Sequence, residues 1–251
     1  MGKHTEKKSN KKKRFLNILI VIFIIALIIS IVYIAKWFMD NKENEKIADK
    51  VSEAIIESNE NEEEIEYKVD FEKLKEINNQ IVAYLKVKGT KIEYAVVQAK
   101  DNNYYLRRNL DKKYNVGGSI FMDYKNKLDG TDKNIVIYGH NIKDGSMFGT
   151  LKNILDEEWY NNEQNYIINL TTEKEEQKYQ VFSVYKIENE DYYIDTEFKK
   201  NEFKKFVKTL KDRSIKDFKV EVTEEDSILT LSTCADNNKY RIVLHAKIMS
   251  D

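Results

Sequence analysis

The sequence predicts a mainly β domain, a closed or nearly closed barrel of about eight short strands, preceded by one transmembrane helix. Two observations carry this prediction. Short runs rich in β-branched and aromatic residues recur between residues 81 and 249, and only two helical patterns interrupt them. A long apolar segment stands near the N-terminus, and a charged stretch separates it from these runs.

The apolar segment at residues 15–36 has the length and composition of a membrane-spanning helix. About 20 helical residues, each rising ~1.5 Å, cross a hydrocarbon core of about 30 Å. Residues 1–14 carry seven basic groups and one acidic group, so the N-terminus is expected to stay in the cytoplasm. The alternative is a cleaved signal peptide, but the run is too long and no small-residue cleavage site follows it. We expect a single-pass protein of the cell membrane whose remaining residues are extracytoplasmic.

Residues 37–70 form a charged segment that we expect to be a linker or stalk. Ile47, Val51 and Ile55 recur at four-residue spacing, which indicates that part of it is helical. The acidic stretch from Asn59 to Glu66 is typical of a solvated tether. The folded domain is therefore expected to cover residues 71–251.

Within residues 71–251, a short helical pattern from Phe71 to Ile77 comes first. The residues Lys88-Gly-Thr90 are a hairpin candidate between the first two strands. The expected strands are residues 81–87, 92–98, 119–122, 134–138, 166–171, 179–187, 228–233 and 242–249. The two expected amphipathic helices are residues 147–160 and 197–210.

Composition limits the classes of function. The net charge is -1, and because the N-terminal tail is basic, the rest of the chain is mildly acidic. Such a balance gives no reason to expect nucleic acid as a partner. The single cysteine excludes an intramolecular disulfide, and no Cys/His cluster has the spacing of zinc ligands. The sequence therefore predicts neither a metal nor a cofactor.

The only cysteine, Cys234, follows an apolar run that begins at Ile228 and so lies at the end of an expected strand. Side chains alternate along a strand, so Cys234 shares a face with Ser232 and Thr230. Taken alone, a lone cysteine is most often a small buried core residue, and that alternative stays open here. A lone thiol on the extracytoplasmic side is also a hint of nucleophilic chemistry.

A cysteine attacks as its thiolate and needs a basic or cationic neighbour. Among the three histidines, His4 lies in the basic tail, and His245 lies within the last expected strand, where we expect a surface position. His140 stands where a strand opens into a loop and is the acid–base candidate; the alternative is a histidine that caps loop backbone. Arg241 offers a permanent cation for an oxyanion, or else forms a weak surface ion pair.

Several motifs resemble those of the sortases, the membrane-anchored cysteine transpeptidases of Gram-positive bacteria, and specifically those of class B. Thr230-Leu-Ser-Thr-Cys234 followed by Arg241 is similar to the sortase Thr-Leu-x-Thr-Cys…Arg signature. Tyr138-Gly-His140 and the loop after it resemble the class B histidine segment. Three further matches are Lys88–Gln98, Asp101–Leu106 and Gly118–Asp123.

The resemblance runs from about residue 71 to 248 and implies the eight-stranded sortase β-barrel. It implies that Cys234 is the nucleophile, His140 the general acid–base, and Arg241 the residue that orients the substrate or stabilises the oxyanion. Asp236 matches an acidic position once proposed as a third catalytic member, and we assign it no role. Residues that match the family's groove for the sorting signal are Asn102, Leu106, Tyr138, Tyr193, Ile194 and Ser232.

The implied function is transpeptidation at the cell surface. Cys234 would attack the Thr carbonyl of a C-terminal sorting signal, NPxTN-like or NPxTG-like, on a secreted surface protein. A thioacyl-enzyme would form, and an amine of a peptidoglycan precursor or cross-bridge would resolve it. The partners implied are this peptide, the wall amine, and the membrane through the N-terminal anchor.

Other functions stay open. A class B-type pilin polymerase would use a pilin lysine as the nucleophile, although no lid segment stands out in residues 40–70. A membrane-anchored cysteine protease would use the same residue types, but in papain-like enzymes the Cys precedes the His, the reverse of this chain. A non-enzymatic binding domain would leave Cys234 inert. Ala95 in place of the family's usual proline, and the short loop between Cys234 and Arg241, bear on peptide preference.

Overall fold

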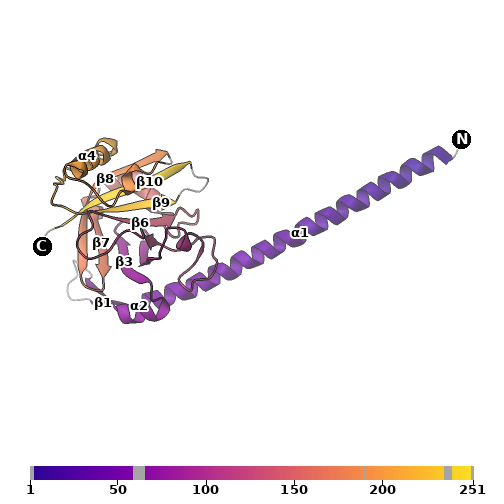
Figure 1. Ribbon diagram of the computed structural model, residues 1–251. Helices are drawn as coiled ribbons and strands as arrows, with labels where there is room; N and C mark the ends of the chain where they lie inside the picture. The colour runs from indigo at the N-terminus through magenta and orange to yellow at the C-terminus, as the bar shows by residue number, and fades with distance from the viewer. Residues whose placement is uncertain (1–2, 59–65, 189, 235–238, 250–251) are drawn as a thin grey trace. The chain divides into compact units, whose positions relative to one another are not determined.

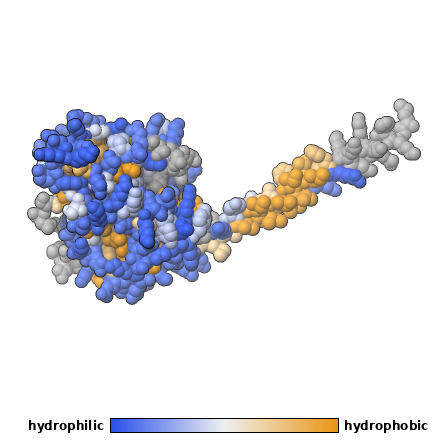
Figure 2. Space-filling model, viewed as in Figure 1, coloured by the Kyte–Doolittle hydropathy of each residue, from blue (hydrophilic) through white to orange (hydrophobic). Residues whose placement is uncertain are grey.

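The computed structural model describes residues 3–58, 66–188, 190–234 and 239–249. The chain divides into two compact units, Met1–Ala48 and Asp49–Asp251. Helix α1 (Lys3–Ser52) supplies the first unit, and its last residues, from Asp49 on, belong to the second. Between Lys13 and Lys36 it is long and apolar enough to cross a membrane, and Figure 2 shows these apolar residues gathered along it. The expected apolar helix is confirmed as a helix and as a candidate membrane span.

The second unit is built on a closed barrel, which confirms the predicted fold class (Figure 1). The strand order around the barrel is β10-β8-β7-β3-β4-β5-β6-β9. Every expected strand is found, with ends that differ by at most three residues, and β3 and β4 form the expected hairpin. The strands are β3 (Ile81–Val87), β4 (Ile92–Val97), β5 (Phe121–Met122), β6 (Asn134–His140), β7 (Ile167–Thr172), β8 (Glu176–Glu188), β9 (Ile228–Cys234) and β10 (Tyr240–Ile248).

The hydrophobic core fixes which face of each strand points inward. On β6 and β9, the alternating residues Ile135, Ile137, Leu229 and Leu231 belong to the core cluster. Because side chains alternate along a strand, the residues between them lie on the opposite face. That opposite face carries polar side chains such as Ser232, and it is where the candidate site residues of these strands lie.

The helix expected at residues 147–160 is instead two short pieces, the 3₁₀ helix η2 (Leu151–Leu155) and α3 (Glu157–Tyr160). Asp156 between them is extended, with φ −84° and ψ 141°, so the helical backbone cannot run through it. Trp159 is nevertheless buried, as its place in the apolar stripe predicts, and its indole Nε1 donates to the Lys88 carbonyl at 3.1 Å. The periodicity thus identified Phe148, Leu151 and Trp159 correctly as buried, whereas Leu155 is half-buried and the backbone differs from the continuous helix that was expected.

The helix expected at residues 197–210 begins and ends later, as α4 (Glu202–Arg213), which packs on β8. Asn201 precedes it in the left-handed conformation, with φ 66°, and this residue ends the irregular segment before the helix. The expected apolar stripe is present: Phe203, Phe206 and Leu210 are buried. The remaining short helices are α2 (Phe71–Ile77), η1 (Tyr104–Arg107), η3 (Glu163–Tyr166) and η4 (Tyr192–Ile194).

The segment expected to be a charged linker contains a small sheet. Strands β1 (Ile55–Ser58) and β2 (Glu66–Val69) pair antiparallel, and the compact unit that holds the barrel begins at Asp49 rather than near Phe71. Tyr67 is buried, and its ring meets that of Tyr84 on β3 edge to face. Four-residue strands within charged sequence carry too little apolar pattern to predict. The stretch 59–65, expected to be a solvated tether, lies outside the described residues.

Candidate active site

The candidate nucleophile and the candidate acid–base residue end two adjacent strands. Strands β6 and β9 run parallel, and their register pairs His140 with Cys234. The backbones of paired residues on neighbouring strands lie about 4.8 Å apart. Gly139, next to His140, lets Ile120 and Phe148 pack closely against β6, because a Cβ at this position would collide with their side chains. The two residues that sequence reasoning selected are therefore neighbours in the fold.

A main-chain carbonyl orients the His140 ring. Its Nε2 lies 2.8 Å from the Leu106 carbonyl oxygen. A carbonyl only accepts hydrogen bonds, so Nε2 carries the proton and Nδ1 is the nitrogen that can exchange one. Leu106 lies in η1, and the buried Tyr105 holds this helix in place. The Tyr105 hydroxyl donates to Gln80 Oε1 at 2.6 Å and accepts from Asn78 Nδ2 at 2.8 Å.

Arg241 lies near the start of β10, the strand on the other side of β9. Strand β10 pairs antiparallel with β9, and Val243 faces Ser232. This pairing is described as far as Val243, two residues after Arg241. Its Nη1 atom is buried without a hydrogen-bond partner among the residues that the structure describes. An unsatisfied buried donor costs about 1–3 kcal/mol, so a guanidinium kept in this position suggests an acceptor that arrives with a ligand.

Two predicted groove residues meet at a carboxylate that sequence reasoning did not single out. Asn102 Nδ2 donates to Asp123 Oδ2 at 2.8 Å, and the Tyr138 hydroxyl donates to the same oxygen at 2.9 Å. Asp123 is buried, and its other oxygen accepts from the Lys125 backbone N–H at 2.9 Å. The segment Gly118–Asp123 had matched the family pattern, but nothing in the spacing assigned a role to its last residue.

The other predicted groove residues lie on and beneath η4. The Tyr193 hydroxyl and Ser232 Oγ are 2.9 Å apart, and both residues are buried, so they face each other. Ile194, next to Tyr193, is half-buried. The structure thus brings Tyr193 and Ser232 together and places the Leu106 carbonyl against His140. Asp236 lies outside the described residues.

The expectation that His245 lies on the surface is wrong, because this side chain is fully buried. The barrel core covers one face of β10, and aromatic side chains, Tyr185 and Tyr193 among them, cover the face on which His245 lies. The Tyr185 hydroxyl lies 2.9 Å from Nε2, and Thr230 Oγ1 lies 2.9 Å from Nδ1. Burial lowers the pKa of His245 to about 3, so the ring is neutral at physiological pH.

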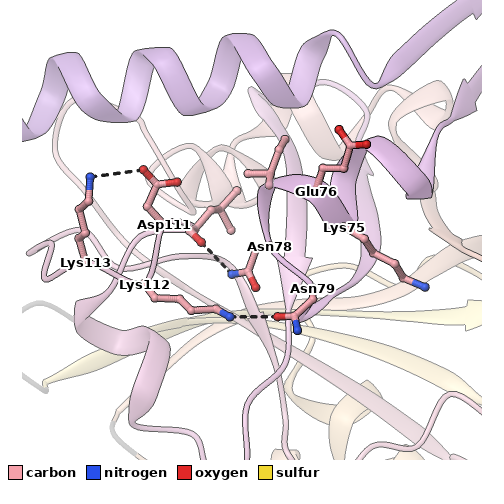
Figure 3. A pocket seen from close by; sticks show the side chains of 9 residues that line it. Lys75, Glu76, Asn78, Asn79, Asp111, Lys112 and Lys113 are labelled. Carbon is pink, nitrogen blue, oxygen red and sulfur yellow. Dashed lines mark hydrogen bonds and ion pairs between the residues drawn. The ribbon is translucent and has the colours of Figure 1, made fainter.

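An open cleft of about 400 Å³ lies between the end of α2 and the loop at residues 110–113 (Figure 3). None of the candidate site residues lines it. Its polar groups pair with one another: Lys112 Nζ donates to Asn79 Oδ1 at 3.0 Å, and Lys113 Nζ lies 3.6 Å from Asp111 Oδ2. Within the described parts of the chain, no group of three or more His, Cys, Asp or Glu side chains is arranged to hold a metal ion.

Comparison with known proteins assigns the class of protein that this barrel and site define. A family model described as a sortase domain matches residues 85–249. The chain therefore belongs to the sortase family, whose members are cysteine transpeptidases.

The individual relatives are sortases of class B. The chain is 33% identical to sortase B of Staphylococcus aureus over 247 residues, which cover 95% of this chain and 98% of the relative. Sortase B of Listeria monocytogenes is 38% identical over 183 residues, 70% of this chain and 73% of that protein. A structure of sortase B from B. anthracis superposes with a TM-score of 0.73 at 38% identity, covering 85% of this chain and 100% of that one. The resemblance to class B is confirmed.

Burial of His245 predicts a stability that depends on pH. The unfolded chain binds a proton below the ordinary pKa of 6.5, whereas the folded chain does not until about pH 3. The stabilising contribution is complete above pH 6.5 and is lost as the pH falls through this window. At about 1.4 kcal/mol per pKa unit, the total loss approaches about 5 kcal/mol.

The measurement is the urea midpoint of the full chain in detergent, between pH 7 and pH 4, for wild type and for His245→Gln. The variant should be less stable at pH 7 but should lose less stability on acidification, because it has no imidazole to protonate. An identical loss in both proteins would contradict the assignment of this pH dependence to His245.

Proposed function

We propose that this protein cleaves a C-terminal sorting signal of secreted proteins at the Thr carbonyl and joins the acyl fragment to a peptidoglycan amine. The observation that carries the proposal is the row formed by His140, Cys234 and Arg241 at the ends of three adjacent strands, with one guanidinium nitrogen unpartnered among the described residues. Similar proteins support it: one related structure is a substrate complex of Staphylococcus aureus sortase B, and another is a sortase B complexed with triglycine.

In the first half-reaction, the Cys234 thiolate attacks the Thr carbonyl carbon. A sulfur–carbon bond forms, and the carbonyl oxygen takes the negative charge. Arg241 Nη1 donates to this oxyanion, which supplies an acceptor for the buried nitrogen. The carbon–nitrogen bond then breaks, and the leaving amine takes a proton from Nδ1 of His140. The product is a thioester on Cys234.

In the second half-reaction, a wall amine attacks the thioester carbon and gives its proton to His140. The sulfur leaves as thiolate, and one amide has been exchanged for another. Splitting the acyl transfer into two steps replaces one high barrier with two lower ones. The Leu106 carbonyl keeps Nε2–H engaged throughout, so that the same ring nitrogen gives and takes the proton.

The groove for an NPxTN-like or NPxTG-like signal is proposed to be lined by the residues that resemble those of class B enzymes. Asn102 is set for this task, because its amide Nδ2 is bound to Asp123 and its Oδ1 accepts from the Tyr124 backbone N–H at 3.0 Å. Both ends of the amide are therefore oriented, and each keeps one further hydrogen-bonding position for the peptide. Tyr138 is held on the same carboxylate.

The first test measures cleavage and transfer together. With an NPxTN-type peptide and triglycine or a diaminopimelate peptide as the amine, the full chain should yield a new amide as well as the released fragment. Cys234→Ala should abolish both products, and His140→Ala should lower kcat/KM by about 10²–10⁴-fold, the usual contribution of a positioned acid–base group.

His4→Ala, a change in the N-terminal tail, is the control and should match wild type. Cleavage that survives in Cys234→Ala would reject the nucleophile. Cleavage without any amine in the product would favour the cysteine protease alternative, and transfer only to a pilin lysine would favour the pilin polymerase.

Arg241→Lys tests the oxyanion role. The substitution keeps the charge but loses the planar fork, so we expect a loss of about 2–4 kcal/mol of transition-state stabilisation. The loss should appear mainly in kcat, because the contact tightens as the oxyanion forms. Arg14→Lys in the N-terminal tail is the control. Wild-type kinetics in Arg241→Lys would remove this residue from the chemistry.

The N-terminal tail is proposed to be cytoplasmic, with α1 crossing the membrane and the barrel outside. This arrangement would hold the site where secreted substrates leave the membrane. Protease added to intact protoplasts should degrade the chain beyond residue 40 and leave an epitope tag at the N-terminus untouched. Complete protection of the barrel, with degradation only after lysis, would refute this topology.

A further inference from the structure

The outer face of four adjacent strands carries the residues proposed for catalysis and, further along, a second cluster of polar side chains. This second cluster consists of Tyr185, His245, Thr230 and Asn134. Strands β8, β10, β9 and β6 are consecutive in the barrel. The β10–β9 register pairs His245 with Thr230, and the same face carries Arg241 four residues earlier on β10. The second cluster is thus about 13 Å along the strands from the catalytic row. The short helix η4 supplies groups at both ends of this cluster.

The hydrogen-bond directions in this cluster can be assigned from one end. Asn134 Nδ2 donates to the backbone carbonyls of Tyr193 at 3.3 Å and Asp195 at 2.9 Å, so its Oδ1 is the acceptor that faces Thr230. Thr230 Oγ1 donates to that Oδ1 at 2.7 Å. With its only proton in use, the hydroxyl must accept from His245 Nδ1. The neutral ring therefore carries its proton on Nδ1.

The other side of the ring completes the sequence of donors. Nε2 of His245 can then only accept, so the Tyr185 hydroxyl donates to it. The Tyr192 hydroxyl in turn donates to the Tyr185 oxygen at 3.1 Å. Tyr192 is the first residue of η4, and the last acceptors, the carbonyls of Tyr193 and Asp195, are in and next to η4. The chain of bonds begins and ends on this helix.

The four side chains of this second cluster are buried, so the loss of any one of their hydrogen bonds costs stability. Asn134, Thr230 and His245 are fully buried, and Tyr185 is 2% exposed. A buried polar group that loses its partner is costly, whereas a fully satisfied network specifies one arrangement of the elements that carry it. Apolar side chains would suffice to fill this space. The hydrogen-bond network, unlike apolar packing, fixes the position of η4 relative to the strands.

We propose that Tyr185, His245, Thr230 and Asn134 are positioning residues that set the place of η4 and so of the groove wall for the sorting signal. This inference rests on the proposed function, because it assigns Ile194 and the Tyr193–Ser232 pair to that wall. Ser232 lies two residues before Cys234, so a displaced η4 alters how the peptide approaches the thiol. The four residues touch no reacting atom and act through the peptide's binding.

The test compares Thr230→Val, which keeps the shape and removes the hydroxyl, with Thr230→Ser, which keeps the hydroxyl. Thr230→Val should raise the KM for the peptide about 3–10-fold with kcat within about twofold, because the wall is displaced and the chemistry is intact. Thr230→Ser should restore the wild-type KM. Tyr185→Phe should reproduce the effect and replaces Thr230→Val if that variant does not fold.

Tyr179→Phe is the matched control, since this tyrosine is also buried on β8 but donates to Gln177 at 2.7 Å outside the network. It should leave KM unchanged. An equal rise in KM for Tyr179→Phe, or an unchanged KM in both Thr230→Val and Tyr185→Phe, would overturn the proposal.

A second readout needs no substrate. In ¹⁵N-labelled full chain in detergent, long-range proton–nitrogen correlations should show His245 protonated on Nδ1, and amide exchange of Tyr192–Ile194 should speed up in Thr230→Val but not in Thr230→Ser. A proton on Nε2, or unchanged exchange in Thr230→Val, would overturn the inference. If wild type fails to process the peptide, the proposed function fails, and these spectra still decide whether the network positions η4.

Discussion

The parallel pairing of β6 with β9 is the constraint on which the rest of the site depends. It sets His140 beside Cys234, although the two residues are far apart in the sequence. A slip of β6 by one residue would break the pairing of His140 with Cys234 and turn the His140 side chain toward the barrel core. The slip is prevented because the same shift would move the apolar residues that alternate with His140 on β6, such as Ile137, out of the core. Core packing therefore sets the geometry of the polar face.

Two short 3₁₀ helices flank this face, and each is held by hydrogen bonds from buried polar side chains. Helix η1 is fixed through Tyr105, which binds Gln80 and Asn78, and it presents a carbonyl to His140. Helix η4 is held through the His245 network and through the Tyr193–Ser232 contact. Single-turn helices bury little apolar surface, so directional polar contacts are what can hold them in one place.

Local pattern was enough to predict the barrel strands and the apolar helix, and it also selected the three residues that we propose for catalysis. Strand ends are marked by changes in apolar pattern, and Cys234, His140 and Arg241 lie at those changes. The burial of His245 could not be predicted, because it depends on Tyr185 and η4 covering the outer face of β10. Asp123 was missed for a similar reason: its partners, Asn102 and Tyr138, come from separate segments. The hairpin β1–β2 lies in a segment whose charge masks its two short strands.

The contact between the Leu106 carbonyl and His140 Nε2 has a consequence for how this site tolerates change. Many catalytic histidines are oriented by a carboxylate side chain, which one substitution removes. Here the orienting oxygen belongs to the main chain, so every amino acid at position 106 supplies it as long as η1 keeps its conformation. A substitution scan would therefore pass over the group that fixes the tautomer of His140. Substitutions of Tyr105, Gln80 or Asn78, whose hydrogen bonds hold η1 in place, would instead displace this carbonyl.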